Sequence, residues 1–204
     1  MISKSKIHLQ ITKIVGDHFI QLRDGKRQEF FDTLRYFWGN KVDAWERAIS
    51  NLENISQSAN LLCLCSHVDE LWNVGYFGLK PLGSSDDGKK VRVQFHWLPE
   101  NRFVTNKSLG DVTLRPERAG FSPRSCKLWN CDTEKKFASG DVLEFRTRDP
   151  LRLPLPSFEL LELRWHFSRI LSMSGTSNVI AADLGFHRST LVGVDEFKAH
   201  EEKG

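Results

Sequence analysis

At 204 residues, the chain is long enough to bury a core as one sizeable domain, or as a small domain with an appended one. Its 40% hydrophobic and 27% charged residues are close to the globular average and argue against a disordered, fibrous or membrane-spanning chain. The net charge of +3 is too small to indicate a nucleic-acid-binding protein by itself. Met1 to Lys6 are polar and cationic, and no apolar run of signal-peptide length follows. We therefore expect an intracellular protein, in the nucleus or the cytoplasm, that is neither secreted nor inserted in a membrane.

The N-terminal quarter predicts a β-hairpin followed by two helices. Residues 7–22 alternate apolar and polar on both sides of a Gly-Asp pair, as in two strands joined by a turn. Apolar residues, most of them aromatic, recur at helical spacing over residues 27–38, and a Gly-Asn pair provides a stop. Residues 42–51 repeat the helical pattern after a short link.

The next segment predicts a strand, a short helix and a second strand. Residues 60–65 contain a short continuous apolar run, which favours a buried strand. Ser66 is placed to cap a helix whose first turn carries Asp69, where a carboxylate suits the positive end of the helix dipole. Gly75 closes this helix, and residues 76–81 return as a strand.

The second half predicts further antiparallel strands and one long helix. A polar loop at 83–90 precedes strict apolar alternation over 91–97, which together indicate a hairpin. Residues 126–147 favour another hairpin region. A proline-rich link then leads to Ser157, which caps a long amphipathic helix that ends near Gly175.

The four cysteines do not have the spacing of a zinc site. Cys63 and Cys65 are separated by one residue, and Cys126 and Cys131 have no histidine at a suitable distance. We predict reduced cysteines that pack as small apolar residues.

The segment NLLCLCSHVDELWNVGYFGLKP at residues 60–81, with LRYFWG at 34–39, carries a family resemblance. It resembles the HNH-endonuclease-domain proteins common in fungi, in which an Asn-Leu-Leu-x-Leu-Cys strand leads to a His-x-Leu-Trp-Asp helix and a Phe-Ala-Leu-Lys-Pro strand. Three later segments are similar to the region that follows in that family: QFHWLP at 94–99, KLWNCDTEKKFASGD at 127–141 and PLPSFELLELRWHFSRILSMSG at 154–175. The resemblance covers most of residues 7–175.

The resemblance implies an α+β fold of the ββα-metal type. An HNH-like hairpin-helix core is then followed by antiparallel strands and a long C-terminal amphipathic helix. We expect an HNH-nuclease-like region at 1–81 and a β-rich extension at 82–175 whose helix packs on the same core. The tail at 176–204 has few anchoring residues, so we expect it to be disordered.

The resemblance also implies a chemistry, because in such a fold two strands and a helix hold one divalent metal ion beside a histidine base, which an asparagine orients. Asn60 matches the family asparagine that opens the second strand, and Asp69 matches the helix histidine; a carboxylate is a suitable ligand for Mg²⁺ or Mn²⁺. Lys13 stands where the base histidine belongs, and an amine needs a strongly lowered pKa to serve as a base near pH 7. The candidate site consists of His18 and Asn60 as catalytic residues and His67 and Asp69 as metal ligands. Structural roles remain open: a connector residue for Asn60, a dipole-matched carboxylate for Asp69 and a solvent-facing side chain for His18.

Two functions follow, with nucleic acid as the candidate partner of both. The first is a pseudoenzyme, a binding or structural module with impaired or lost phosphodiesterase activity, because Lys13 and Asp69 replace two histidines. The second is an active endonuclease that uses Mg²⁺ or Mn²⁺ to cleave DNA or RNA. A third reading is that residues upstream of Met1 are missing and would restore the absent histidine.

Overall fold

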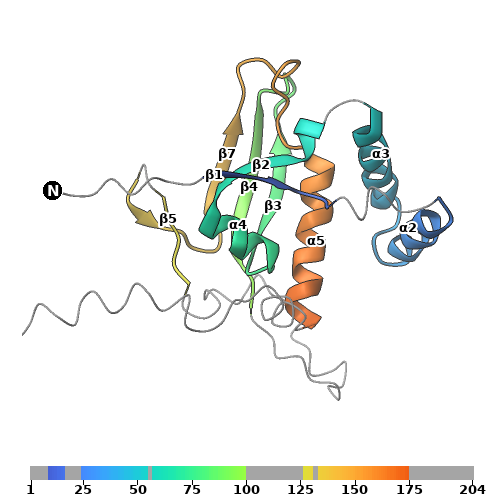
Figure 1. Cartoon of the computed structure of the whole chain (residues 1–204), viewed down its shortest axis with the longest axis horizontal. Coiled ribbons are helices and arrows are strands. Elements are labelled where there is room, and N and C mark those ends of the chain that lie inside the picture. Colours follow the sequence, from blue (N-terminus) through green and yellow to red (C-terminus); the bar gives the residue numbers. More distant parts are fainter. Residues whose placement is uncertain (1–8, 17–23, 55–56, 100–125, 131–132, 175–204) are drawn as a thin grey trace, which may run out of the picture.

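The structure, a computed structural model, describes residues 9–16, 24–54, 57–99, 126–130 and 133–174 (Figure 1). Its helices and antiparallel sheets confirm the predicted α+β class. The predicted tail at 176–204 and the candidate residue His18 lie outside the described ranges. Within those ranges, no helix combines the length and the apolar character needed to span a membrane.

The predicted helices and central strands are found within a few residues of their predicted bounds. In chain order the elements are β1 (Leu9–Lys13), α2 (Asp24–Trp38), α3 (Lys41–Asn54), the 3-10 helix η1 (Gln57–Asn60), β2 (Leu61–Cys65), α4 (Ser66–Asn73), β3 (Phe77–Ser84), β4 (Lys90–Trp97), β5 (Trp129–Asn130), β6 (Lys135–Lys136), β7 (Val142–Arg146) and α5 (Phe158–Ser174).

Strand β1 pairs with a strand that is distant in the sequence. Its described antiparallel partner is β2, and the register places Lys13 opposite Leu61. We had predicted a hairpin within residues 7–22, whose second half falls in 17–22, outside the described residues. Alternation identifies a strand but not its partner, and here the two helices α2 and α3 intervene between the paired strands. Because α4 follows β2 directly, these elements form a ββα unit that is split in the sequence.

The ββα unit lies against a three-stranded sheet with the order β3-β4-β7 (Figure 1). Trp72 of α4 meets Phe77 of β3 with ring centroids 5.5 Å apart. On β3, Gly78 allows α5 to approach closely, because a Cβ there would lie 2.7 Å from the Trp165 ring. One buried cluster joins the ββα unit to this sheet and to α5.

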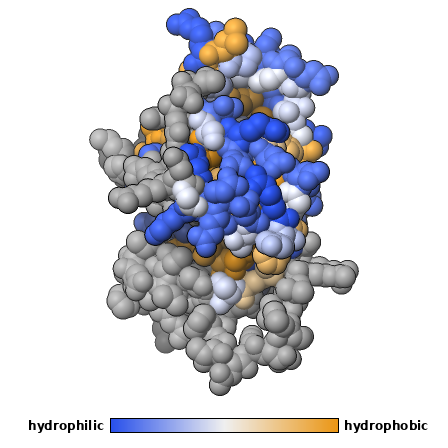
Figure 2. All heavy atoms as spheres, turned by 90° about the vertical axis from the view of Figure 1, so that its right-hand side faces the viewer, coloured by the Kyte–Doolittle hydropathy of each residue, from blue (hydrophilic) through white to orange (hydrophobic). Residues whose placement is uncertain are grey.

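Helices α2 and α3 lie beyond α5, and the side that faces the viewer in Figure 2 is mostly hydrophilic. Arg35 of α2 forms ion pairs with Asp43 and Glu46 of α3. Two bonds to Glu162 attach α3 to α5: Lys41 donates one at 2.9 Å and the Trp45 indole donates the other at 2.9 Å. Burial raises the pKa of Glu162, but these two donors outweigh burial and the net pKa is lowered.

His166 of α5 is packed between aromatic rings. Its ring centroid lies 5.1 Å from that of Trp38 and 5.4 Å from that of Trp45. Burial lowers the pKa of His166 from 6.5 to about 4, and the charge of Glu162 opposes this shift only in part. His166 therefore packs as a neutral ring at neutral pH.

This neutral histidine predicts an acid-sensitive fold. Between pH 6.5 and about 4 the unfolded chain binds a proton at His166 that the folded chain does not, so stability falls as the pH falls. We expect a loss of about 1–2 kcal/mol from this group over that window, after allowance for its partial exposure to solvent. Urea unfolding of wild type and His166→Gln at several pH values measures it, and the variant should show a shallower dependence. His67→Gln, at an exposed position, is the control; an unchanged slope in His166→Gln would contradict the assignment.

The cysteines are only partly as predicted. Cys126 is buried, and Cys63, Cys65 and Cys126 are free thiols. Cys63 is exposed, which contradicts the prediction that it packs as an apolar residue. The register explains the difference, because Cys63 lies opposite Ile11 on the open face of the two-stranded sheet, where Ile11 is also exposed. Cys131 lies outside the described residues.

Candidate functional site

Asn60 joins the end of β1 to the start of β2. It is the last residue of η1 and only 3% of its surface is exposed. Its Oδ1 accepts a hydrogen bond from Val15 N at 2.8 Å, and its Nδ2 donates to Val15 O at 2.9 Å. Its backbone carbonyl accepts a third bond, from Ile14 N at 2.8 Å. Asn60 therefore holds the backbone that follows Lys13 in one conformation, and the proposed catalytic role of its carboxamide stays a prediction.

Lys13 is the last residue of β1 and is exposed. Because successive side chains of a strand point to opposite faces, Lys13 lies on the open face and Thr12 on the buried one. Its partner in the register, Leu61, follows Asn60 directly. Lys13, which the family resemblance aligns with the base histidine, is thus exposed and lies beside the Asn60 contact, and its alignment with the base stays a prediction.

Helix α4 carries the two candidate metal ligands. The N-cap residue of this helix is Cys65, which makes no side-chain capping hydrogen bond. The prediction that Ser66 caps the helix is therefore wrong, because Ser66 is already the first residue of the helix. Gly75 ends the helix as predicted, with a φ of 73°. His67 is exposed, whereas Oδ1 of Asp69 is buried and has no hydrogen-bond partner among the residues that the structure describes.

The helical geometry separates His67 from Asp69. Residues two apart on an α-helix are rotated by about 200° around the axis, so their side chains do not face each other. The structure agrees, because one side chain is exposed and the other has a buried oxygen. These two candidates are not brought together on one ion.

Arg164 of α5, which is not among the candidates from the sequence, lies against Trp72 of α4 and is close enough to Asp69 for their charges to interact. Its Nη2 donates to Trp72 O at 2.8 Å, and its guanidinium carbon lies 4.9 Å from the centroid of the Trp72 ring. Burial lowers the pKa of Arg164 to about 10, and the negative charge of Asp69 opposes that shift. The guanidinium of α5 and the carboxylate of α4 therefore attract each other only over a longer distance than a hydrogen bond, because Oδ1 of Asp69 and Nε of Arg164 have no hydrogen-bond partner within the described part of the chain. The signal in the sequence was an arginine within the apolar face of a long helix.

In a comparison with protein families, residues 14–80 match the family model described as HNH endonuclease. The chain contains an HNH-endonuclease-like domain. The matched segment begins one residue after Lys13 and ends within β3, so it includes the Asn60 contact and the whole of α4. No curated protein matches the chain, and no solved structure does.

The described residues of this HNH-like domain do not fit the divalent ion on which HNH domains generally depend. Among the residues that the structure describes, no three His, Cys, Asp or Glu side chains are grouped so that they could hold a metal ion. The positive charge of Arg164 acts on Asp69, His67 is exposed to solvent, and the Asn60 carboxamide is occupied by backbone atoms. The site residues stay predictions, with His18 outside the described ranges.

Proposed function

We propose that this HNH-like domain binds nucleic acid and has lost, or nearly lost, metal-dependent cleavage. The observation that carries this proposal is the buried guanidinium of Arg164, which is held against Trp72 of α4 and attracts the Asp69 carboxylate of the same helix. A divalent cation at Asp69 would be repelled by this guanidinium, which Trp72 holds in place.

The position of the base supports the same proposal. General-base catalysis needs a group that is deprotonated near the working pH, and an exposed lysine is protonated there. Lys13 is exposed, so burial does not supply the desolvation that turns a lysine into a base. The degenerate motif thus affects both halves of the chemistry, the metal ligand and the base.

Nucleic acid is the proposed partner because HNH domains typically bind it, and residues 14–80 match that family. We also propose, from the segments quoted above, a relationship to the fungal HNH-domain proteins. Contact with nucleic acid implies an intracellular location, in the nucleus or the cytoplasm.

The alternative is an active endonuclease. One observation favours it, because Asn60 still fixes the backbone just before the segment that contains His18. In that case His18 would have to supply the base, and Asp69 would have to bind the ion against the repulsion from Arg164.

A cleavage assay separates the two. The full chain, in excess over supercoiled plasmid, labelled single strands or RNA, should leave all three substrates intact with Mg²⁺, Mn²⁺ or Ni²⁺. The same preparation should shift the anisotropy of a labelled oligonucleotide equally well in EDTA and in Mg²⁺. Asp69→Asn, which keeps the shape of the side chain, should bind as wild type does. Single-turnover cleavage that disappears in Asp69→Asn would overturn the loss of activity, and an absence of binding to every nucleic acid would overturn the partner.

A further inference from the structure

The hairpin formed by β5 and β6 is fixed firmly to the three-stranded sheet. Leu128, just before β5, is buried, and its carbonyl accepts a bond from Phe137 N at 2.8 Å. The Phe137 ring lies 5.5 Å from the ring of Phe95 on β4, and its carbonyl accepts a bond from the Trp97 indole at 3.2 Å. Residues next to both strands of the hairpin, Leu128 before β5 and Phe137 after β6, therefore hold its backbone in place.

The outer side of this hairpin exposes a tryptophan among lysines. Burial alternates along the chain, so Leu128 points inward while Lys127 and Trp129 point outward. Trp129 is 59% exposed. Lys136 lies opposite Trp129 in the β5-β6 register and is exposed. Lys135 is also exposed but pairs with Asn130, so it lies at the edge of this side and helps to line the hollow described next. A large aromatic ring beside cations is the combination that binds the bases and phosphates of a single strand.

A hollow of about 210 Å³ lies next to this surface. The hollow is lined by Asn130, Thr133, Lys135, Lys136, Phe137 and residues 141–143, the last two of which begin β7. Most of its polar groups are amide, hydroxyl and ammonium groups. The hollow is smaller than the roughly 300–1,000 Å³ typical of cofactor pockets, so it suits one small part of a larger ligand.

We propose that Trp129, Lys127, Lys135 and Lys136 form a binding surface for single-stranded nucleic acid. This inference rests on the proposed function and assigns it a location. An unpaired base stacks on Trp129, and the three ammonium groups contact the phosphates on either side. A duplex fits poorly, because its bases are already stacked and paired.

The local charges make stacking the main contribution. Beside the three lysines stand Glu134, at the turn, and Asp141, whose carboxylate accepts a bond from Ala138 N. The positive excess is therefore small. Three phosphate contacts predict a slope of about −2 for the logarithm of the binding constant against the logarithm of the salt concentration, which is a weak salt dependence.

The test measures binding of the full chain to labelled oligothymidylate and oligouridylate of about 12 nucleotides, and to a duplex of the same length, by anisotropy. Trp129→Ala should weaken single-strand binding about tenfold, whereas Trp129→Phe, which keeps a stacking ring, should stay within about threefold of wild type. Tyr36→Ala is the matched control, because Tyr36 on α2 is 91% exposed and should not contribute. The two single strands show whether DNA or RNA is preferred.

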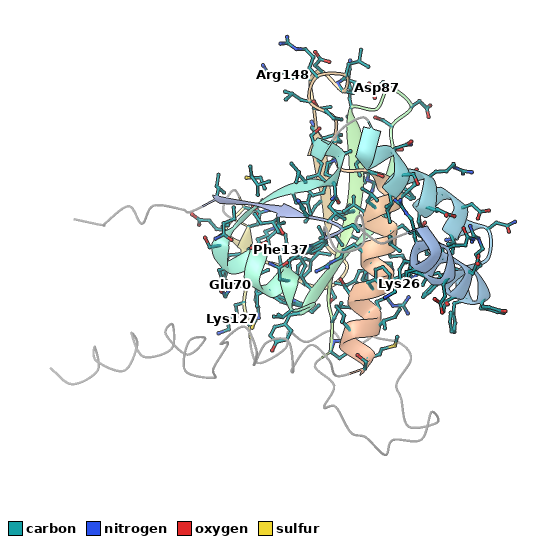
Figure 3. The ribbon with its side chains drawn as sticks, turned by 45° about the vertical axis from the view of Figure 1, so that its right-hand side comes forward. Lys26, Glu70, Asp87, Lys127, Phe137 and Arg148 are labelled. Carbon is teal, nitrogen blue, oxygen red and sulfur yellow. The ribbon has the colours of Figure 1, made fainter. Side chains whose placement is uncertain are left out.

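A charge pair completes the test. Lys136→Glu should weaken binding and reduce the salt slope by about 0.7 or more, whereas Lys26→Glu, an exposed lysine on α2, should change neither. Figure 3 shows Lys26 on the opposite side of the molecule from Lys127 of the hairpin. If wild type binds single strands and Trp129→Ala binds equally well, this inference fails and the proposed function stands. If wild type binds no nucleic acid, both fail; a preference for duplex would also overturn the surface.

Discussion

Replacing Arg164 by methionine is expected to lower the free energy of unfolding by about 3 kcal/mol, in part because it removes the positive charge that attracts the Asp69 carboxylate. The substitution also removes the bond from Nη2 to Trp72 O and the stacking on the Trp72 ring. Methionine keeps the length and apolar contacts of the side chain, so a large cavity does not explain the loss. Urea unfolding followed by tryptophan fluorescence measures it.

A double-mutant cycle isolates the charge contribution. Asp69→Asn removes the carboxylate charge, so the loss caused by Arg164→Met should be smaller in the Asp69→Asn background than in wild type. The control is Arg47→Met on α3. Arg47 is exposed, so its replacement should change the free energy of unfolding by less than about 0.5 kcal/mol. Additive effects of Arg164→Met and Asp69→Asn would contradict an electrostatic interaction between the two residues, and with it the argument that Arg164 disfavours a metal ion at Asp69.

Local periodicity predicted most of the secondary structure, because each helix or strand of the central region buries one face. The helical spacing of Phe31 and Leu34 is confirmed by burial of both residues in α2. The alternation of Val91, Val93 and Phe95 is confirmed in the same way in β4. The partner of β1 could not be predicted like this, since pairing with β2 depends on contacts across the intervening helices.

The candidate site was predictable in one respect and not in another. The two-residue spacing of His67 and Asp69 already excludes a shared ion once the segment is a helix, because of the rotation per residue. The position of Arg164 could not be predicted, because it reaches Trp72 of α4 from α5, and nothing in its own segment indicates which residue it contacts. The family pattern thus located the framework, and a residue outside the matched segment at 14–80, Arg164, adds a positive charge whose field reaches Asp69.

Asn60→Ala is expected to destabilise the fold by about 2–4 kcal/mol. The substitution removes both side-chain bonds to Val15 and leaves a buried N–H and a buried carbonyl oxygen without partners, each of which costs about 1–3 kcal/mol. Asn60→Asp should recover part of this loss, because its carboxylate still accepts from Val15 N but does not donate to Val15 O. Urea unfolding compares the three proteins.

Two further measurements separate this structural role from catalysis. Amide hydrogen exchange at Val15 should become faster in Asn60→Ala, because the side-chain oxygen that accepts from that amide is gone. Asn73→Ala, at an exposed asparagine of α4, should leave both stability and exchange unchanged. Wild-type stability in Asn60→Ala would contradict the structural role. A loss as large as expected would mean that Asn60 holds the end of β1 in place through the fold itself, whether or not a base lies next to it.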